Sequence, residues 1–154
     1  MEYASVVWDP HQNYLIDKLE KVQNQCARFV LNYYELGASV TNMKHALHWE
    51  KLSERRKLFR MKFLDDIYNN RLLINRDVFL HEPFYVSERA DHPKKIRPYS
   101  CRNDTFAFSF FPKTIEQWNR LPKDVLAANL VFLNFQLYSV FIDSVFLFNF
   151  NIDP

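Results

Sequence analysis

The chain has 154 residues, of which 48% are hydrophobic and 17% aromatic, with a single glycine and a formal net charge of +2. This length suits one domain with a real core. One glycine argues against phosphate-cradling loops, tight hairpins and dinucleotide-binding folds, because these need positive φ or close backbone approach. The composition therefore predicts helices joined by proline-containing loops.

Charge is distributed unevenly along the chain. Residues 1–50 carry 4 basic and 6 acidic side chains, residues 51–102 carry 13 and 7, and residues 103–154 carry 3 and 5. The middle third, with a net charge of +6, is therefore the plausible electrostatic footprint for a polyanion.

A long amphipathic helix is predicted over residues 10–33. Asp9 can cap the free N–H groups of its first turn, and Pro10 suits the first helical position, where its missing N–H would be unpaired anyway. Apolar residues then recur at steps of three and four and form one stripe: Leu15, Leu19, Val22, Cys26, Phe29, Val30 and Tyr33. This stripe must be buried against the rest of the chain or against a larger body, and we expect its cysteine to be an inert structural thiol.

Two further helices are predicted next. Gly37 can stop the long helix, and Ser39 can cap a short helix that includes Met43. A third helix is expected over residues 50–70, ended by the Asn69–Asn70 pair. Its apolar line contains Leu52, Phe59, Phe63 and Ile67, and its outer face contains Glu54, Arg55, Arg56, Lys57, Arg60 and Lys62.

Periodicity fades over residues 71–101, where prolines and basic residues recur, and this indicates an extended basic arm. Phe106, Phe108 and Phe110 then alternate with small residues, which predicts a short strand or extended segment with one apolar face. A short helix is expected from Lys113 to Asn119, after Pro112.

The last helix is predicted over residues 130–140, and the remaining residues are interpreted as an untrimmed tail. Polar residues interrupt the apolar run 130–150, and Asp143 would cost about 3 kcal/mol at a bilayer centre, so we expect no membrane span.

The predicted fold class is mainly α: a small helical module with one long amphipathic helix, a basic proline-containing arm and a short extended aromatic segment. The expected segments are a helical part over residues 1–70, a linker arm over 71–103, a C-terminal helical cap over 104–140, and the tail over 141–154. Trp8, Trp49 and Trp118 are expected to be core anchors, because each lies beside apolar neighbours at an element boundary.

Basic residues of the third helix and of the arm are the candidate nucleic-acid contacts, because lysine and arginine neutralise phosphates. Aromatic residues interleaved with them, Phe84, Tyr85 and Tyr99, can stack on unpaired bases. The candidate binding residues are Arg55, Arg56, Arg60, Lys94, Lys95, Arg97 and Arg102.

No catalytic or metal site is predicted. Residues 63–66 (FLDD) resemble the palm box of reverse transcriptases, but paired carboxylates that hold Mg²⁺ there must sit in a tight hairpin, and this stretch has a helical pattern. The five histidines and two cysteines have no metal-ligand spacing. No glycine loop or nucleophile–base pair is evident either, so a free-standing enzyme is disfavoured.

Three blocks carry a resemblance to a known family. They are residues 2–10 (EYASVVWDP) leading into 19–23 (LEKVQ), residues 52–56 (LSERR), and residues 109–122 (SFFPKTIEQWNRLP). In this order they resemble the C-terminal thumb and post-thumb region of the reverse transcriptase of non-LTR retrotransposons of the LINE type (jockey- or CR1-like). The resemblance covers residues 2–140, and beyond Leu137 the sequence departs from the usual family ending.

The resemblance implies a C-terminal fragment of an RNA-directed DNA polymerase. Its implied role is non-catalytic: it supports template RNA and primer DNA during target-primed reverse transcription, while the palm and its Mg²⁺ lie in an upstream domain. The implied partners are RNA template, DNA primer or target, and the upstream polymerase domain, with no cofactor and no membrane. An intracellular location, cytoplasmic or nuclear, is expected.

Two alternatives remain open from the sequence. The chain can be a helical protein-interaction module, in which apolar grooves matter more than the basic arm. It can also be a decayed copy of the element with no independent function.

Overall fold

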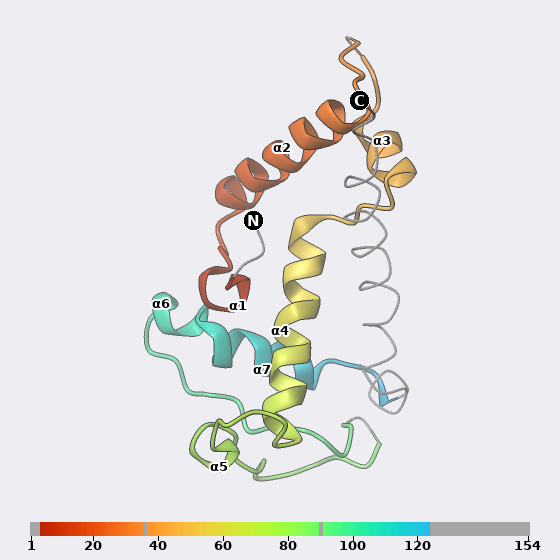
Figure 1. Ribbon diagram of the computed structural model, residues 1–154. Helices are drawn as coiled ribbons and strands as arrows, with labels where there is room; N and C mark the ends of the chain where they lie inside the picture. Colours follow the sequence, from red (N-terminus) through yellow and green to blue (C-terminus); the bar gives the residue numbers. More distant parts are fainter. Residues whose placement is uncertain (1–3, 36, 90, 124–154) are drawn as a thin grey trace. The chain divides into compact units, whose positions relative to one another are not determined.

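The computed structural model describes residues 4–35, 37–89 and 91–123, and these residues are predominantly helical (Figure 1). Their helices are α1 (Ser5–Trp8), α2 (Asn13–Val30), α3 (Val40–Ala46), α4 (Leu52–Tyr68), α5 (Arg76–Phe79), α6 (Asp104–Ala107) and α7 (Phe110–Asn119). The predicted mainly-α class is confirmed. The predicted last helix over 130–140 and the tail lie outside the described residues.

The chain forms two compact units, and each combines two separate stretches of sequence. Unit 1 comprises Met1–Leu64 and Ser100–Thr114, and unit 2 comprises Asp65–Tyr99 and Ile115–Pro154. Helices α4 and α7 each supply residues to both units.

The start of the long helix differs from the prediction. Helix α2 begins at Asn13, and the residue at its N-cap position, Gln12, makes no side-chain capping bond. The prediction that Asp9 caps this helix is therefore wrong. Asp9 instead follows the short helix α1 in an extended conformation, and its carboxylate is engaged by basic side chains from elsewhere in unit 1.

Three helices end in the same way without glycine. At the ends of α2, α3 and α4, Asn32, His48 and Asn70 adopt φ values of 46°, 53° and 53°. In each case the N–H of the following residue bonds back across the last turn, as from Tyr33 to the carbonyl of Arg28 at 3.0 Å. This is the Schellman arrangement, which normally favours glycine. The predicted end at Asn70 is confirmed, whereas the long helix ends at Val30, with Asn32 and not Gly37 as the left-handed residue after it.

Within the described residues, helix α2 buries its predicted apolar stripe only in part: Leu15, Leu19 and Val30 are half-buried. Its buried residues are Gln23 and Ala27, whereas Cys26 is exposed and Phe29 is 72% exposed. Gln23 donates from Nε2 to the carbonyl of Glu50 at 2.9 Å, so the covered face of this helix carries a polar anchor. The expectation of a buried Cys26 is therefore wrong.

The short helix α3 confirms the capping signal at its start. Ser39 precedes Val40, and its Oγ accepts a hydrogen bond from the backbone N–H of Asn42 at 3.4 Å. Met43 is buried, as the predicted apolar line of this helix requires.

Helix α4 also confirms its prediction in position and length. Leu52, Leu64 and Ile67 are buried along it. The FLDD stretch lies within this helix, where Asp65 and Asp66 both accept hydrogen bonds from Nη1 of Arg71, at 3.0 and 2.9 Å.

The predicted extended aromatic segment is helical instead. Asn103 accepts a hydrogen bond from the N–H of Phe106 at 2.9 Å and caps α6, and α7 begins at Phe110. The alternation of aromatic and small residues is thus overridden by a local cap. Within unit 1, the ring of Phe110 meets that of Phe63 edge-on at 5.4 Å between centroids.

The tryptophans differ in burial. Trp118 is fully buried, as predicted, whereas Trp8 is 40% exposed and is not enclosed by the described residues.

Replacing His48 by glycine should stabilise the protein, because glycine adopts the left-handed conformation of this position without a Cβ penalty. The expected gain is about 0.5–1 kcal/mol in the free energy of unfolding. Lys57→Gly, at an exposed position inside α4, should cost about 1 kcal/mol. Urea unfolding followed by circular dichroism measures both, and a loss of stability in His48→Gly would contradict the expectation.

Candidate nucleic-acid interface

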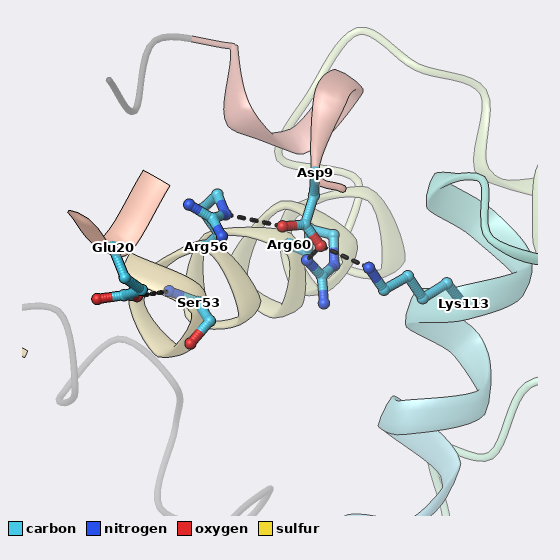
Figure 2. A network of polar contacts seen from close by, with 6 residues as sticks. All are labelled: Asp9, Glu20, Ser53, Arg56, Arg60 and Lys113. Carbon is cyan, nitrogen blue, oxygen red and sulfur yellow. Dashed lines mark hydrogen bonds and ion pairs between the residues drawn. The ribbon is translucent and has the colours of Figure 1, made fainter. Parts of the chain in front are cut away.

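Two of the predicted binding residues lie in a buried ionic cluster of unit 1 (Figure 2). Arg56 and Arg60 are one turn apart on α4, and both point toward the carboxylate of Asp9. Arg56 donates from Nε to Oδ1 of Asp9 at 2.8 Å, and Arg60 donates to Oδ2. Lys113 of α7 reaches the same Oδ2 from the other side at 2.6 Å. We call these four residues the Asp9 cluster.

This geometry corrects the placement of both arginines. The sequence predicts Arg56 and Arg60 on the outer face of their helix, but their side chains are only 1% and 3% exposed. They lie inward because Asp9 offers them a carboxylate, and the long stems of arginine are buried readily along apolar surface. Their guanidinium groups are therefore not presented to a ligand in solution.

Burial and charge act in opposite directions on the Asp9 cluster. Burial raises the pKa of Asp9, but the hydrogen bond from Lys113, the charge of Arg60 and the hydrogen bond from Arg56 outweigh it, so its pKa lies below the usual value. Burial lowers the pKa of Arg60, and the attraction of Asp9 opposes that change. The carboxylate is thus held ionised among three cations.

A second contact in unit 1 orients the start of α4. Glu20 of α2 accepts a hydrogen bond through Oε1 from the backbone N–H of Ser53 at 3.1 Å (Figure 2). A carboxylate beside the free N–H groups of a helix start is favoured by the helix dipole. Lys44 of α3 lies 3.7 Å from the other oxygen of Glu20, so this carboxylate joins three helices.

The basic arm in unit 2 is irregular but firmly tethered. The side chain of Asn119 donates to the carbonyl of Ile96 at 2.7 Å and accepts from its N–H at 3.0 Å. Trp118 donates from Nε1 to the carbonyl of Lys94 at 2.8 Å. Ile96 is buried, and so is His92, whose Nε2 lies 3.0 Å from the carbonyl of Trp118. These bonds fix the backbone from which the basic side chains project.

Within the arm, residues 97 and 99 bond to residues at the end of α5 and just after it. Arg97 donates from its backbone N–H to the carbonyl of His81 and from Nε to the carbonyl of Glu82, both at 2.9 Å. The hydroxyl of Tyr99 donates to the carbonyl of Phe79 at 2.6 Å. Burial raises the pKa of that hydroxyl. The predicted stacking residue Tyr99 is therefore half-buried and contributes to the tether.

The cations of the arm contact aromatic rings. The guanidinium carbon of Arg97 lies 3.8 Å from the centroid of Phe84, and that ring is 88% exposed. Nζ of Lys94 lies 5.9 Å from the centroid of Tyr68. Among the described residues, neither Lys94 nor Arg97 forms an ion pair with a carboxylate. Both distances fall within the range of cation–π attraction.

Lys95 behaves differently from its neighbours. Its Nζ lies 2.7 Å from Asp91, and this hydrogen bond is the main reason that the pKa of Asp91 is lowered. The predicted binding residues thus divide between the two units. Lys94, Lys95 and Arg97 share the arm, whereas Arg102 is exposed and Arg55 half-buried in unit 1.

The sequence reasoning missed one cation that lies beside the same aromatic ring as Lys94 of the arm. Arg76, at the start of α5, places its guanidinium carbon 4.4 Å from the centroid of Tyr68. Asn75 caps α5 by accepting a hydrogen bond from the N–H of Asp77 at 3.1 Å. That asparagine is the signal that could have identified the short helix within the loop. We call Arg76, Lys94, Arg97 and the rings of Tyr68 and Phe84 the cation–aromatic surface.

Comparisons with protein-family models, with curated proteins and with solved structures find no match for this chain. None of the helices in the described part of the chain is long and apolar enough to cross a membrane.

Asp9→Asn should destabilise unit 1 strongly, because it leaves three cations around a neutral amide. Removing one partner of a buried ion pair typically costs about 3–5 kcal/mol. Asp17→Asn, which removes an exposed carboxylate from α2, is the matched control and should change the free energy of unfolding by less than about 0.5 kcal/mol. Equal effects of the two substitutions in urea unfolding would contradict a stabilising Asp9 cluster.

The contribution of Asp9 should also depend on pH. Because its pKa is lowered in the folded protein, its stabilisation is complete above the unfolded pKa of about 3.9 and is lost as the pH falls through the folded pKa. The stability difference between the wild type and Asp9→Asn should therefore shrink below about pH 5. Unfolding experiments at pH 7, 5, 4 and 3 measure this, and a constant difference would contradict the expectation.

Proposed function

We propose that this chain is a non-catalytic, nucleic-acid-binding part of an RNA-directed DNA polymerase of the non-LTR retrotransposon type. It supports template RNA and primer DNA, and catalysis belongs to an upstream polymerase domain. The observation that carries the nucleic-acid-binding part of the proposal is the cation–aromatic surface on a tethered backbone in unit 2. The class of polymerase rests on the resemblance of the three sequence blocks.

The chemistry of this surface suits a single-stranded polyanion. Arg97 and Lys94 contact neutral rings, so their positive charges remain available to phosphates. Phe84 and Tyr85 are 88% and 74% exposed and offer aromatic faces to unpaired bases. Basic side chains with interleaved aromatic residues are typical of proteins that bind single strands through phosphate contacts and stacking.

The tether adds to the argument. An ordered binding surface loses less conformational entropy on association than a flexible loop of the same composition. The bonds from Trp118 and Asn119 to the backbone of Lys94 and Ile96 supply that order. Both anchoring residues belong to the third block of the family resemblance, so the end of that block and the basic arm meet in unit 2.

Binding to single-stranded RNA and to a short RNA–DNA hybrid, measured by fluorescence anisotropy across a salt series, tests the proposal. Affinity should fall steeply with salt, and the double variant Lys94→Gln/Arg97→Gln should lower the log–log slope by about 1 per lost phosphate contact. Phe84→Ala should weaken single-strand binding by about 1–3 kcal/mol through lost stacking.

The matched control removes the same charge elsewhere. Lys18→Gln/Lys21→Gln neutralises two exposed lysines of α2 and should leave the salt slope unchanged. If both double variants lower the salt slope equally, the effect comes from net charge alone. That result would overturn the assignment of nucleic-acid binding to the cation–aromatic surface. Extension of a primer on an RNA template by the purified chain would contradict its non-catalytic role.

A further inference from the structure

Helix α2 buries Gln23 and Ala27, half-buries Leu15, Leu19 and Val30, and leaves the rest of its apolar stripe exposed. On its covered face, Gln23 bonds to the backbone of Glu50, and Glu20 bonds to that of Ser53. On another face, Val22 and Phe29 are 41% and 72% exposed, and Cys26 is exposed between them. Steps of three and four residues place these side chains in one row.

The buried face of α2 therefore does not coincide with its apolar stripe. At 100° per residue, Gln23 and Ala27 lie roughly a fifth to a third of a turn from the centre of the stripe. Contacts of the polar face with the loop and start of α4 fix this orientation. The apolar row therefore stays uncovered by the described residues.

The charged side chains beside the row indicate what charge a partner would carry. Lys18 and Lys21 are exposed and Arg28 is half-buried. Helical spacing places all three on the side of the row opposite to Gln23. Among the described residues, neither lysine forms an ion pair with a carboxylate, and Asp17 is the one acidic residue of α2 on that side. An apolar row with a basic flank is complementary to an amphipathic helix whose own flank is acidic.

A second copy of this chain fits the row poorly. Two α2 helices packed antiparallel about a two-fold axis bring like flanks together, which places lysines against lysines. A parallel pair would need the opposite flank of α2, which Glu20 and Gln23 already use within unit 1.

We propose that the face of α2 formed by Val22, Cys26 and Phe29, flanked by Lys18 and Lys21, is a docking site for an acidic amphipathic helix of another polypeptide. Apolar side chains enter the row, and glutamates or aspartates of the partner pair with the lysines. This site is independent of the cation–aromatic surface, which lies in unit 2.

A pair of synthetic peptides tests the docking site directly. Each is a helix of about 20 residues, matching the length of α2, with leucines along one face. One peptide carries glutamates beside the leucines, and its twin carries lysines at the same positions. Fluorescence anisotropy should show binding of the glutamate peptide at least about tenfold tighter than that of the lysine twin.

The two exposed cysteines provide a footprint in the native chain. Cys26 lies in the proposed row, whereas Cys101 lies outside it. The glutamate peptide should slow alkylation of Cys26 by a maleimide and leave the rate at Cys101 unchanged. This measurement uses the unmodified chain, so it decides the outcome even where a substituted chain fails to fold.

Substitutions distinguish binding at the apolar row from non-specific binding to exposed apolar residues elsewhere. Val22→Glu/Phe29→Glu should weaken binding of the glutamate peptide by at least about tenfold. Leu73→Glu/Val78→Glu, at exposed apolar positions in unit 2, is the matched control and should have no effect. Lys18→Glu/Lys21→Glu should reverse the preference toward the lysine twin.

Three results would overturn the proposal. The first is equal binding of both peptides, and the second is unchanged alkylation of Cys26 in the presence of the glutamate peptide. The third is a dimer in sedimentation experiments that Val22→Glu/Phe29→Glu dissociates, because it would assign the row to a second copy. None of these results bears on binding of RNA by the wild-type chain, so the two proposals fail separately.

Discussion

The carboxylate of Asp9 is the interaction on which the arrangement of unit 1 depends. It joins the segment between α1 and α2 to α4 and, across 104 residues of sequence, to Lys113 of α7. The cluster is unbalanced, since three cations share one carboxylate and Nη1 and Nη2 of Arg56 are buried without a hydrogen-bond partner. A buried group of this kind adds little net stability compared with an apolar core, but it strongly disfavours any packing that separates its members.

The Asp9 cluster joins three stretches that are far apart in the sequence. The first block contains Asp9, the second contains Arg56, and the third contains Lys113. Residues that are far apart in the sequence, and that carry the resemblance, thus meet at one carboxylate. This contact brings one residue of each block together within unit 1.

Local signals in the sequence predicted most helices correctly, because a cap or a periodic pattern is decided within a few residues. Ser39 at the start of α3 and Asn70 after α4 are of this kind. Which face of a helix is buried depends on distant partners, and there the predictions failed for Cys26 on α2 and for Arg56 and Arg60 on α4. Aspartate is a common capping residue, but the carboxylate of Asp9 accepts hydrogen bonds from arginines 47 and 51 residues away. The aromatic alternation after Asn103 was likewise overridden, here by a capping bond that the pattern does not reveal.

The basic residues illustrate how the partner, and not the residue type, decides what a cation can do. Arg56 and Arg60 pair with Asp9, and Lys95 pairs with Asp91, so in each case an opposite charge cancels much of the field that a phosphate would meet. Arg97 and Lys94 rest beside aromatic rings, which orient a cation without neutralising it. A sequence pattern treats all five residues as equal. The structure separates the cations that pair with a carboxylate from those that contact a neutral ring. The same distinction applies to α2, where the lysines beside the exposed apolar row keep their charge for a partner.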